Sequence, residues 1–518
     1  MQSAIVGLPW SAILLLGAGT LSLLFQAIRN YFYRGLHRYP GPFLANFTDL
    51  WYLLDVRSNQ HHHHLIHLHR RHNSPVLRLG PNTISISQSD FLPQVFGVST
   101  GFLKSEMYDA FANRVNGQIA HTSLSIQDPK LHVQIRKPIT SAYSLTTVTS
   151  YEPLVDQMIS KLIVRLGETS RGLGAEPCNM ALWLRLYAHD VILHLTFSHT
   201  LGFMDAGGDI DGFISKLDGN LNSLALLSAM PRMSYWLKLN PVVAHLRKDS
   251  HMFVGWTVKR IQERIKERHE KYSSAGSSTG GPIDFLDAFL DAAQSDDDPS
   301  GYNFALLIDW TLVNVMGGAD TTAVALRAVL WFLLKDPSRK EELLQEIHSA
   351  RLRVPVSWKQ TQKLPYLDAC VKEALRLCPA IGLGLGRKVP AGGLQMHDGY
   401  MLPAGTNVSM NAWVVNRQDI FGDDPDAFIP ERWLRQGDET VEQHRDRTYQ
   451  MKRADLTFGG GSRACTGRYI AFLEIYKVVP ALLLEFDIEL ADPLAEWVTI
   501  NRWTVRQNDI PCRLQPRK

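Results

Sequence analysis

Near its C-terminal end the chain carries the stretch Phe458-Gly459-Gly460-Gly461-Ser462-Arg463-Ala464-Cys465-Thr466-Gly467, followed by a helix-forming run from Arg468 to about Leu484. Three consecutive glycines allow turn geometries closed to other residues and let the backbone approach a flat ligand closely. Cys465 falls at or near the start of the expected helix, where unpaired N–H groups and the helix dipole stabilise a thiolate. Arg463 offers a rigid fork of donors that suits a carboxylate.

A single thiolate with no second Cys or His at metal spacing does not make a zinc site. It does suit an iron whose other ligands come from a macrocycle, because haem iron can be held by one Cys thiolate. The stretch also matches, position for position, the haem-binding signature of the cytochrome P-450 monooxygenases at Phe458, Gly461, Arg463, Cys465 and Gly467. The chain therefore resembles this family over about residues 30–518. For the glycine loop alone, a buried structural cysteine is the alternative.

The resemblance implies a mainly α fold with small β-sheets, the cytochrome P-450 fold, behind a single N-terminal transmembrane helix. It implies haem b (iron protoporphyrin IX) with Cys465 as the axial ligand of the iron. It also implies a haem-thiolate monooxygenase that inserts one oxygen atom from O₂ into a small apolar organic substrate. Electrons would come from NADPH through a membrane-bound reductase.

Composition and charge agree with a globular protein that has a large core. The 518 residues are 45% apolar and 20% charged, and the net charge of +3 is too small to predict a nucleic-acid partner. Five cysteines are few and odd in number, so no disulfide framework is predicted. A reducing compartment, in which a thiolate ligand survives, fits this composition.

The N-terminal segment predicts a membrane anchor at residues 1–28, because it has no charged residue and is long enough to cross a bilayer as a helix. Arg29, Arg34 and Arg38 follow at once, which places the remainder of the chain in the cytosol. A cleaved signal peptide is the alternative, but the basic n-region that it needs is missing. We therefore expect a single-pass protein of the endoplasmic reticulum membrane, in contact with the lipid bilayer.

The anchor is followed by a basic, proline-containing hinge at residues 29–42, which ends in Tyr39-Pro40-Gly41-Pro42. Residues 43–518 are expected to form one haem-thiolate catalytic domain. The apolar segment Leu221–Leu246 corresponds, by the same resemblance, to the region that roofs the substrate pocket and can enter the membrane, with ordinary core packing as the alternative. Residues 76–86 alternate around Gly80-Pro81-Asn82 and predict a β-hairpin.

Seven histidines cluster between His61 and His72 on an expected amphipathic helix. A metal site is one interpretation. Consecutive histidines point in different directions around a helix, and we identify no carboxylate or cysteine with them. The cluster is therefore predicted to be solvated, and whether it binds metal stays open.

Asp128-Pro129 predicts a helix start, and His132 and Arg136, four residues apart, share one face of that helix. Their position resembles that of the family's helix that binds a haem propionate. A surface His and Arg are the alternative. Downstream, Ile381 to Arg387 alternates as a strand. The resemblance places its leucines beside the haem and Arg387 on the second propionate.

Phe304 to Leu334 predicts a long apolar helix with Gly317-Gly318-Ala319-Asp320-Thr321-Thr322 at its middle. Two glycines and two threonines weaken the helical hydrogen-bond ladder there. The segment resembles the family's oxygen-activation motif, which assigns proton relay to Asp320 and oxygen-site hydrogen bonding to Thr321. A simple helix kink is the alternative.

Glu373 and Arg376 lie three apart on an expected helix, and Arg432 follows in Pro430-Glu431-Arg432-Trp433. The resemblance implies that these three form a buried structural triad beneath the haem loop, with two ordinary salt bridges as the alternative. Basic residues near the thiolate side predict a face for an acidic electron donor: Lys130, Lys137, Lys452, Arg453, Arg468 and Lys477. A solvated charged face is the alternative.

Sequence phrases such as Trp413-Val414-Val415-Asn416-Arg417 most resemble filamentous-fungal members of the family that tailor secondary metabolites. Three other functions stay open. One is a haem-thiolate isomerase or dehydratase, and another is oxidative degradation of an aromatic or xenobiotic compound. The third is a non-enzymatic haem- or metal-binding membrane protein. The Asp320–Thr321 pair favours an enzyme that activates oxygen.

Overall fold

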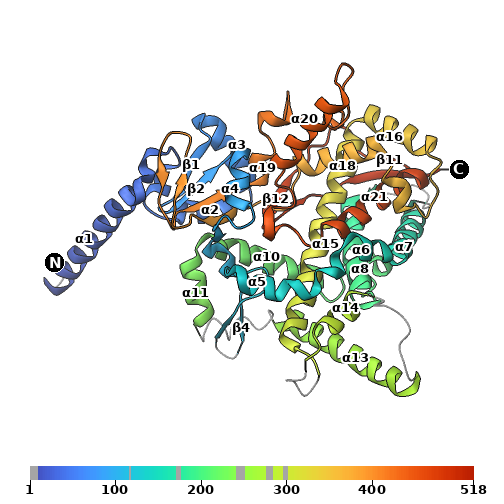
Figure 1. Cartoon of the computed structure of the whole chain (residues 1–518), viewed down its shortest axis with the longest axis horizontal. Coiled ribbons are helices and arrows are strands. Elements are labelled where there is room, and N and C mark those ends of the chain that lie inside the picture. Colours follow the sequence, from blue (N-terminus) through green and yellow to red (C-terminus); the bar gives the residue numbers. More distant parts are fainter. Residues whose placement is uncertain are drawn as a thin grey trace, which may run out of the picture.

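The computed structural model describes residues 10–115, 118–170, 177–240, 251–275, 284–295 and 301–517. Helices dominate and the strands form small sheets, as predicted from the sequence (Figure 1). The helices have these bounds: α1 Trp10–Phe32, α2 Leu50–Arg57, α3 His61–His72, α4 Leu92–Phe96, α5 Pro129–Arg136, α6 Leu145–Ser150, α7 Glu152–Ser170, α8 Met180–Phe197, α9 Phe203–Ala206, α10 Phe213–Ala229, α11 Pro231–Leu239, α13 His251–Ala275, α14 Phe285–Ala292, α15 Phe304–Lys335, α16 Pro337–Ser349, α17 Trp358–Thr361, α18 Pro365–Leu377, α19 Ala412–Val415, α20 Val441–Ala454 and α21 Arg468–Glu485.

The strands have these bounds: β1 Val76–Gly80, β2 Thr83–Ile86, β3 Leu103–Lys104, β4 Asn113–Val115, β5 Gln118–Ala120, β6 Cys178–Asn179, β7 Leu385–Lys388, β8 Leu394–Gln395, β9 Met401–Leu402, β10 Asn407–Met410, β11 Phe486–Leu490, β12 Thr499–Arg502, β13 Thr504–Gln507 and β14 Pro511–Pro516. The largest sheet has the order β1-β2-β10-β7-β3. It contains the β1–β2 hairpin predicted at residues 76–86. At its other edge β3 pairs with β7, which places Lys104 opposite Arg387.

Helix α15 crosses the centre of the molecule and packs against α8, α18, α21 and α13 (Figure 1). Among the described residues it is the one helix found long and apolar enough to cross a membrane, but 78% of its most apolar window is buried in protein. Its surroundings therefore make it a core helix. This burial holds the Gly317–Thr322 segment at the middle of the domain.

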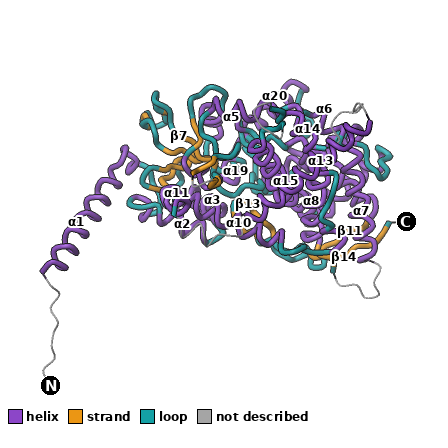
Figure 2. Tube along the Cα trace, turned by 90° about the horizontal axis from the view of Figure 1, so that it is seen from below, coloured by secondary structure: helices purple, strands orange, loops and turns teal. Residues whose placement is uncertain are grey.

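Helix α1 projects away from the rest of the molecule (Figures 1 and 2). It runs four residues beyond the predicted anchor, to Phe32, and its apolar side chains from Leu14 to Phe25 are largely exposed. Residues 1–9 of the predicted anchor lie outside the described part of the chain. Arg78 of β1 fixes the base of α1, because its buried guanidinium donates to the carbonyls of Asn30 at 2.5 Å and Tyr31 at 2.8 Å.

The prediction of a solvated histidine cluster is wrong for His61, His62 and His69, which are buried, whereas His63, His64 and His67 are exposed. Asp55, in α2, accepts from Nδ1 of both His61 at 2.6 Å and His64 at 2.5 Å. His62 and His63 both contact Thr499 Oγ1 through Nε2, at 2.8 and 2.9 Å. No group of three metal-ligating side chains is found in the described residues. The cluster thus joins α3 to α2 and β12, using a carboxylate that the sequence interpretation overlooked.

Candidate active site

The glycine stretch forms a tight loop between α20 and α21. Gly459 and Gly461 adopt φ values of 70° and 59°, in the left-handed region that favours glycine. A side chain at Gly461 would also collide with protein, since its Cβ would lie 1.7 Å from the carbonyl oxygen of Phe96. The Cys465 N–H donates to the Phe458 carbonyl at 2.8 Å and closes the loop. The loop geometry therefore requires glycine at these positions.

Cys465 lies three residues before α21 and is exposed, whereas the other four cysteines are buried. Although part of its surface is accessible, the thiol is surrounded by protein atoms, and this desolvation raises its pKa. The backbone N–H groups of Gly467 and Arg468 and the charge of Arg136 lower the pKa, but their combined effect is smaller. The pKa of the Cys465 thiol is therefore raised, whereas the position near a helix start had predicted a lowered pKa. The helix N-terminus is thus present, but in the protein alone desolvation outweighs it.

Five basic side chains gather near this loop, and we call them the cation cluster: Lys104, His132, Arg136, Arg387 and Arg463. Burial and the repulsion of its neighbours lower the pKa of Lys104, and the same two causes lower the pKa of His132 to about 3. Burial, with Arg387 and Arg136, lowers the pKa of Arg463 to about 10. These mutual effects show that the five groups lie close together.

The cation cluster has carbonyl partners but no carboxylate partner among the described residues. Arg136 donates to the Ser462 carbonyl at 2.8 Å, and Arg463 Nη2 donates to the Gln127 carbonyl at 3.1 Å. Arg387 donates to its neighbour Gly386 and stacks over the Phe96 ring at 4.7 Å. Arg463 Nη1 is buried without any hydrogen-bond partner. Such a set of donors fits the two carboxylates of a haem.

Lys104 is a member of this cluster that the sequence interpretation missed. It is 6% exposed and donates to the Leu124 carbonyl at 2.5 Å. Nothing in the local sequence distinguishes it from a surface lysine. Only the β3–β7 pairing brings it opposite Arg387, and that pairing joins segments about 280 residues apart.

On the core helix α15, Gly317 is exposed and Thr321 is half-buried, although most neighbouring residues are buried. The Thr321 hydroxyl donates to the Gly317 carbonyl at 2.7 Å. Helix α15 packs against α21, the helix that follows the Cys465 loop.

Asp320 is held in a closed ring of four charges, which we call the ion-pair ring: Arg185, Asp218, Asp320 and Arg506. Asp320 accepts from Arg185 Nε and Arg506 Nη2, each at 3.0 Å. Both arginines also bind Asp218 of α10. Burial alone would raise the pKa of Asp320, but the two guanidinium groups outweigh burial and hold that pKa well below its usual range.

Glu373, Arg376 and Arg432 lie together in the core. Glu373 accepts from Arg376 and from Arg432 Nε, each at 2.7 Å, and from Trp433 Nε1 at 2.9 Å. Burial would raise the pKa of Glu373, and the two arginines more than offset it, so its pKa is lowered. Arg376 also donates to the carbonyls of Asn416 and Pro425, at 2.8 and 2.7 Å. Through Asn416, which bonds the Leu456 N–H at 2.9 Å, the network reaches the cysteine loop.

The segment from Ile381 to Arg387 is strand only from Leu385, shorter than predicted. Gly382 approaches the β12–β13 hairpin closely, because its carbonyl accepts from Asn411 and Asn501 Nδ2, each at 2.9 Å. Leu385 reaches the Cys465 loop, 3.7 Å from where a Cβ on Gly459 would stand. The tip of the hairpin holds Trp503 at a φ of 75°, a strained conformation for a bulky residue. Sequence analysis did not identify this strain.

Lys477, predicted in a basic surface face, is fully buried. It forms ion pairs with Glu152 and Asp156, at 2.5 and 2.9 Å. The apolar helix α21 carries it into the core, so it does not contribute to a surface. The prediction for Lys477 is therefore wrong.

Comparison with known proteins identifies the family. The family model described as "Cytochrome P450" matches residues 40–509. The chain is 37% identical over 497 residues to cytochrome P450 monooxygenase cicH of Emericella nidulans, covering 94% of this chain and 96% of that one. It is 32% identical over 510 residues to cytochrome P450 monooxygenase vrtE of Penicillium aethiopicum, covering 97% and 94% of the two chains. The chain therefore belongs to the cytochrome P450 family of haem-containing oxidoreductases.

Proposed function

We propose that this chain is a haem-thiolate monooxygenase that inserts one oxygen atom from O₂ into an apolar organic substrate, as a tailoring step in fungal secondary-metabolite biosynthesis. The observation that carries the proposal is the accessible Cys465 beside a cation cluster without carboxylate partners. Such a site fits a dianionic macrocycle with a metal that needs one thiolate. The names of the fungal relatives support the monooxygenase class.

Cys465 would hold the haem iron as its axial ligand, and haem b, once bound, would supply oxygen activation. Arg136, His132, Arg387, Arg463 and Lys104 would hold the propionates. Charge-assisted hydrogen bonds of this type are worth about 1.5–3 kcal/mol each. Phe458, Gly461 and Gly467 would shape the loop that brings the thiolate to the ring. The Glu373–Arg376–Arg432 triad would keep this loop in place through Asn416.

Thr321 and Asp320 would serve the oxygen site in different ways. The Thr321 hydroxyl is bound to the Gly317 carbonyl within the same turn, so it can hold or release a hydrogen bond at this accessible point. Asp320 stays ionised within the ion-pair ring. It would therefore orient hydrogen-bonding groups and accept a proton only transiently, rather than store one.

The substrate pocket would be apolar. Leu385 lies at the cysteine loop, and the Trp503 ring packs edge-on against Phe111 with centroids 4.4 Å apart. Helix α10 would form part of the roof of this pocket. Its Asp218 shares two arginines, Arg185 and Arg506, with Asp320. The predicted roof continues through α11, and its last residues, 241–246, lie outside the described residues. These side chains favour a small apolar molecule bound by burial of its surface.

Membrane attachment is supported by the exposed leucines of α1 and by α11, which exposes Met233, Tyr235 and Trp236. Helix α11 lies on the same side of the molecule as the base of α1 (Figures 1 and 2). Residues 1–28 would be a single-pass anchor in the endoplasmic reticulum membrane. Residues 29–42 would link it to a cytosolic catalytic domain, 43–518. A membrane-bound reductase that oxidises NADPH would dock on the basic face without Lys477.

The proposal is tested with the full chain, haem and reductase in lipid nanodiscs. Candidate apolar metabolites are screened by the change in ferric spin state, and those that bind are turned over under ¹⁸O₂. A product that gains one ¹⁸O atom is the expected result. A product isomeric with its substrate, formed without O₂ consumption, would instead establish an isomerase and overturn the proposal.

The role of Thr321 is tested by comparing Thr321→Ala with Thr322→Ala, its buried neighbour. We expect Thr321→Ala to retain haem and to release several times more peroxide per NADPH than wild type, because a proton donor at the oxygen site is lost. Thr322→Ala should couple NADPH oxidation to product formation as wild type does. Full coupling of NADPH to product in Thr321→Ala would count against the assigned role.

A further inference from the structure

His189, on α8, is a buried histidine in which one ring nitrogen forms a hydrogen bond and the other does not. It is 2% exposed, and its Nδ1 lies 2.9 Å from the Arg185 carbonyl oxygen. A carbonyl oxygen can only accept, so Nδ1 carries the hydrogen. Burial and the nearby Arg185 charge lower the pKa of His189, although the charge of Asp320 opposes them. The ring is therefore neutral, and Nε2 presents a lone pair.

Nε2 of His189 has no hydrogen-bond partner, although it is buried. Asp320 Oδ1 lies 4.0 Å away, and it also accepts hydrogen bonds. The charged groups around this pair are Arg185, Asp218, Arg506 and Arg327, and three of them already belong to the ion-pair ring. Two acceptors at this separation need a donor between them, and one water molecule can donate to both.

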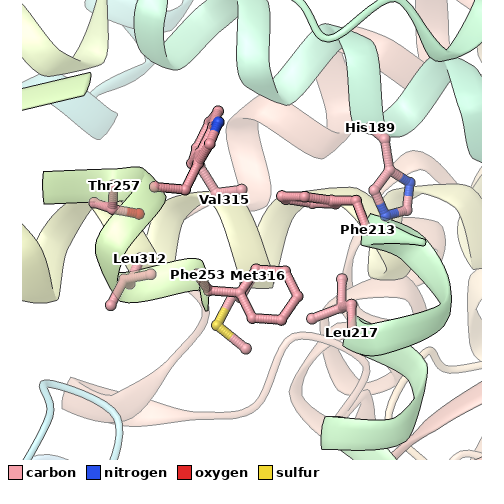
Figure 3. A pocket seen from close by; sticks show the side chains of 9 residues that line it. His189, Phe213, Leu217, Phe253, Thr257, Leu312, Val315 and Met316 are labelled. Atoms are coloured by element: carbon pink, nitrogen blue, oxygen red, sulfur yellow. The ribbon is translucent and has the colours of Figure 1, made fainter. Parts of the chain in front are cut away.

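A small cavity opens beside His189 (Figure 3). Its volume of about 10 Å³ matches the space that one water molecule needs. His189 lies at one end of it next to Phe213, and Val315 and Met316 of α15 line it as well. Met316 directly precedes Gly317, whose carbonyl binds Thr321. The other lining groups are mostly apolar and Asp320 is not among them, so a water that also bonds Asp320 would lie at the His189 edge of the cavity.

We propose that one water molecule, at the edge of the cavity that His189 lines, bridges His189 Nε2 and Asp320 Oδ1, which makes His189 a positioning residue for proton supply to the Asp320–Thr321 segment. The water site stands on the geometry alone. The effect on proton supply rests on the function proposed above. Through this water, His189 holds the Asp320 carboxylate in its place in the ion-pair ring. The water also keeps an exchangeable hydrogen next to that carboxylate.

The water is tested by a high-resolution crystal structure of the haem-loaded full chain. We expect an ordered water within about 3.2 Å of both His189 Nε2 and Asp320 Oδ1, and its loss in His189→Phe. Wild-type density with no water between these two atoms would overturn the proposal, and so would a direct His189–Asp320 hydrogen bond. This measurement does not depend on any enzymatic activity.

The positioning role is tested by NADPH oxidation with the reductase, in H₂O and in D₂O. We expect His189→Phe and His189→Gln to slow NADPH oxidation about tenfold and to enlarge the solvent isotope effect, as general acid–base assistance is weakened. His194→Gln, a matched change on the same helix whose ring contacts Gln157 at 3.1 Å, should behave as wild type. The haem content of all variants should be unchanged.

Unchanged rate and isotope effect in both His189 variants would overturn the positioning role. If wild type itself oxidises no NADPH, the proposed function fails instead, and the water site is still decided by the crystal structure. If wild type binds no haem, the proposed function also fails, and the same two atoms are examined in a crystal structure of the haem-free full chain. If His189→Phe does not fold, His189→Gln gives the same kinetic comparison.

Discussion

Two groups of basic side chains lie in the core and differ in how their charge is balanced. In the ion-pair ring, Arg185 and Arg506 share Asp218 and Asp320, and the four charges cancel. In the cation cluster no carboxylate of the described chain forms an ion pair with any member, and Arg463 Nη1 has no hydrogen-bond partner. Buried charges are costly unless paired. The ion-pair ring is therefore balanced by the chain itself, whereas the proposed haem propionates would supply the negative charge that the cation cluster lacks.

The largest effect is expected from breaking the ring. Asp320→Asn removes one negative charge and leaves two buried guanidinium groups with one carboxylate, which should cost about 3–5 kcal/mol of unfolding free energy. Asp205→Asn is the control, since Asp205 also binds two cations, Lys161 and Arg165, but is exposed. It should cost less than about 1 kcal/mol. Urea unfolding of both variants measures the difference, and equal costs would contradict the account of the ring.

Lys104→Met in the cation cluster is expected to change the unfolding free energy less than Asp320→Asn does, and not to lower it. Removing one of several repelling cations should leave the haem-free protein as stable as wild type or more so. It should weaken haem binding about tenfold, because one charge-assisted hydrogen bond is lost. The measurements are haem titration and urea unfolding without haem.

The matched control for Lys104→Met is Lys388→Met, on β7. Lys388 is already paired with Glu106, so its removal should leave haem binding unchanged. If the haem-free Lys104→Met protein were strongly destabilised, the cluster would be part of the fold rather than a ligand site.

The third effect concerns the pH dependence of stability and is spread over several pH units. The folded pKa of His132 is about 3, well below the unfolded value near 6.5, because burial and the other cations disfavour its charge. A depressed folded pKa gives stability that is present above pH 6.5 and is lost as the pH falls toward 3. In His132→Gln this loss should shrink by at most about 1.4 kcal/mol per pH unit in that window.

Urea midpoints of the haem-free protein from pH 7 to 4 measure this slope. His397→Gln, on an exposed histidine, is the control and should keep the wild-type slope. A slope in His132→Gln identical to that of wild type would show that His132 is not held neutral by the cluster.

Structural features that depend on residues close together in the sequence were predictable. The glycine loop, the helix from Phe304 and the β1–β2 hairpin follow from local patterns, and the structure has each of them. Helix α1 was also predicted, though it continues to Phe32. These patterns depend on periodicity and on turn residues, which act over a few positions.

Features that depend on long-range pairing were not predictable. Arg185 and Arg506 reach Asp320 from positions 135 and 186 residues away, and no local pattern marks either arginine. Lys104 joins its cluster only through β3–β7, and His62 and His63 find Thr499 more than 430 residues along the chain. Lys477 was misjudged because its charge suggested the surface, while its two carboxylate partners lie on α7. In each case tertiary packing decides the outcome.

The central claim is that Cys465 binds haem iron as a thiolate. It is tested most directly by reducing the haem-loaded full chain with dithionite, adding carbon monoxide and recording the absorption spectrum. We predict the strongly red-shifted Soret band of a thiolate-bound haem in wild type and its absence in Cys465→Ala. A folded, haem-loaded wild-type protein without that band, or a Cys465→Ala protein that keeps it, would contradict the account.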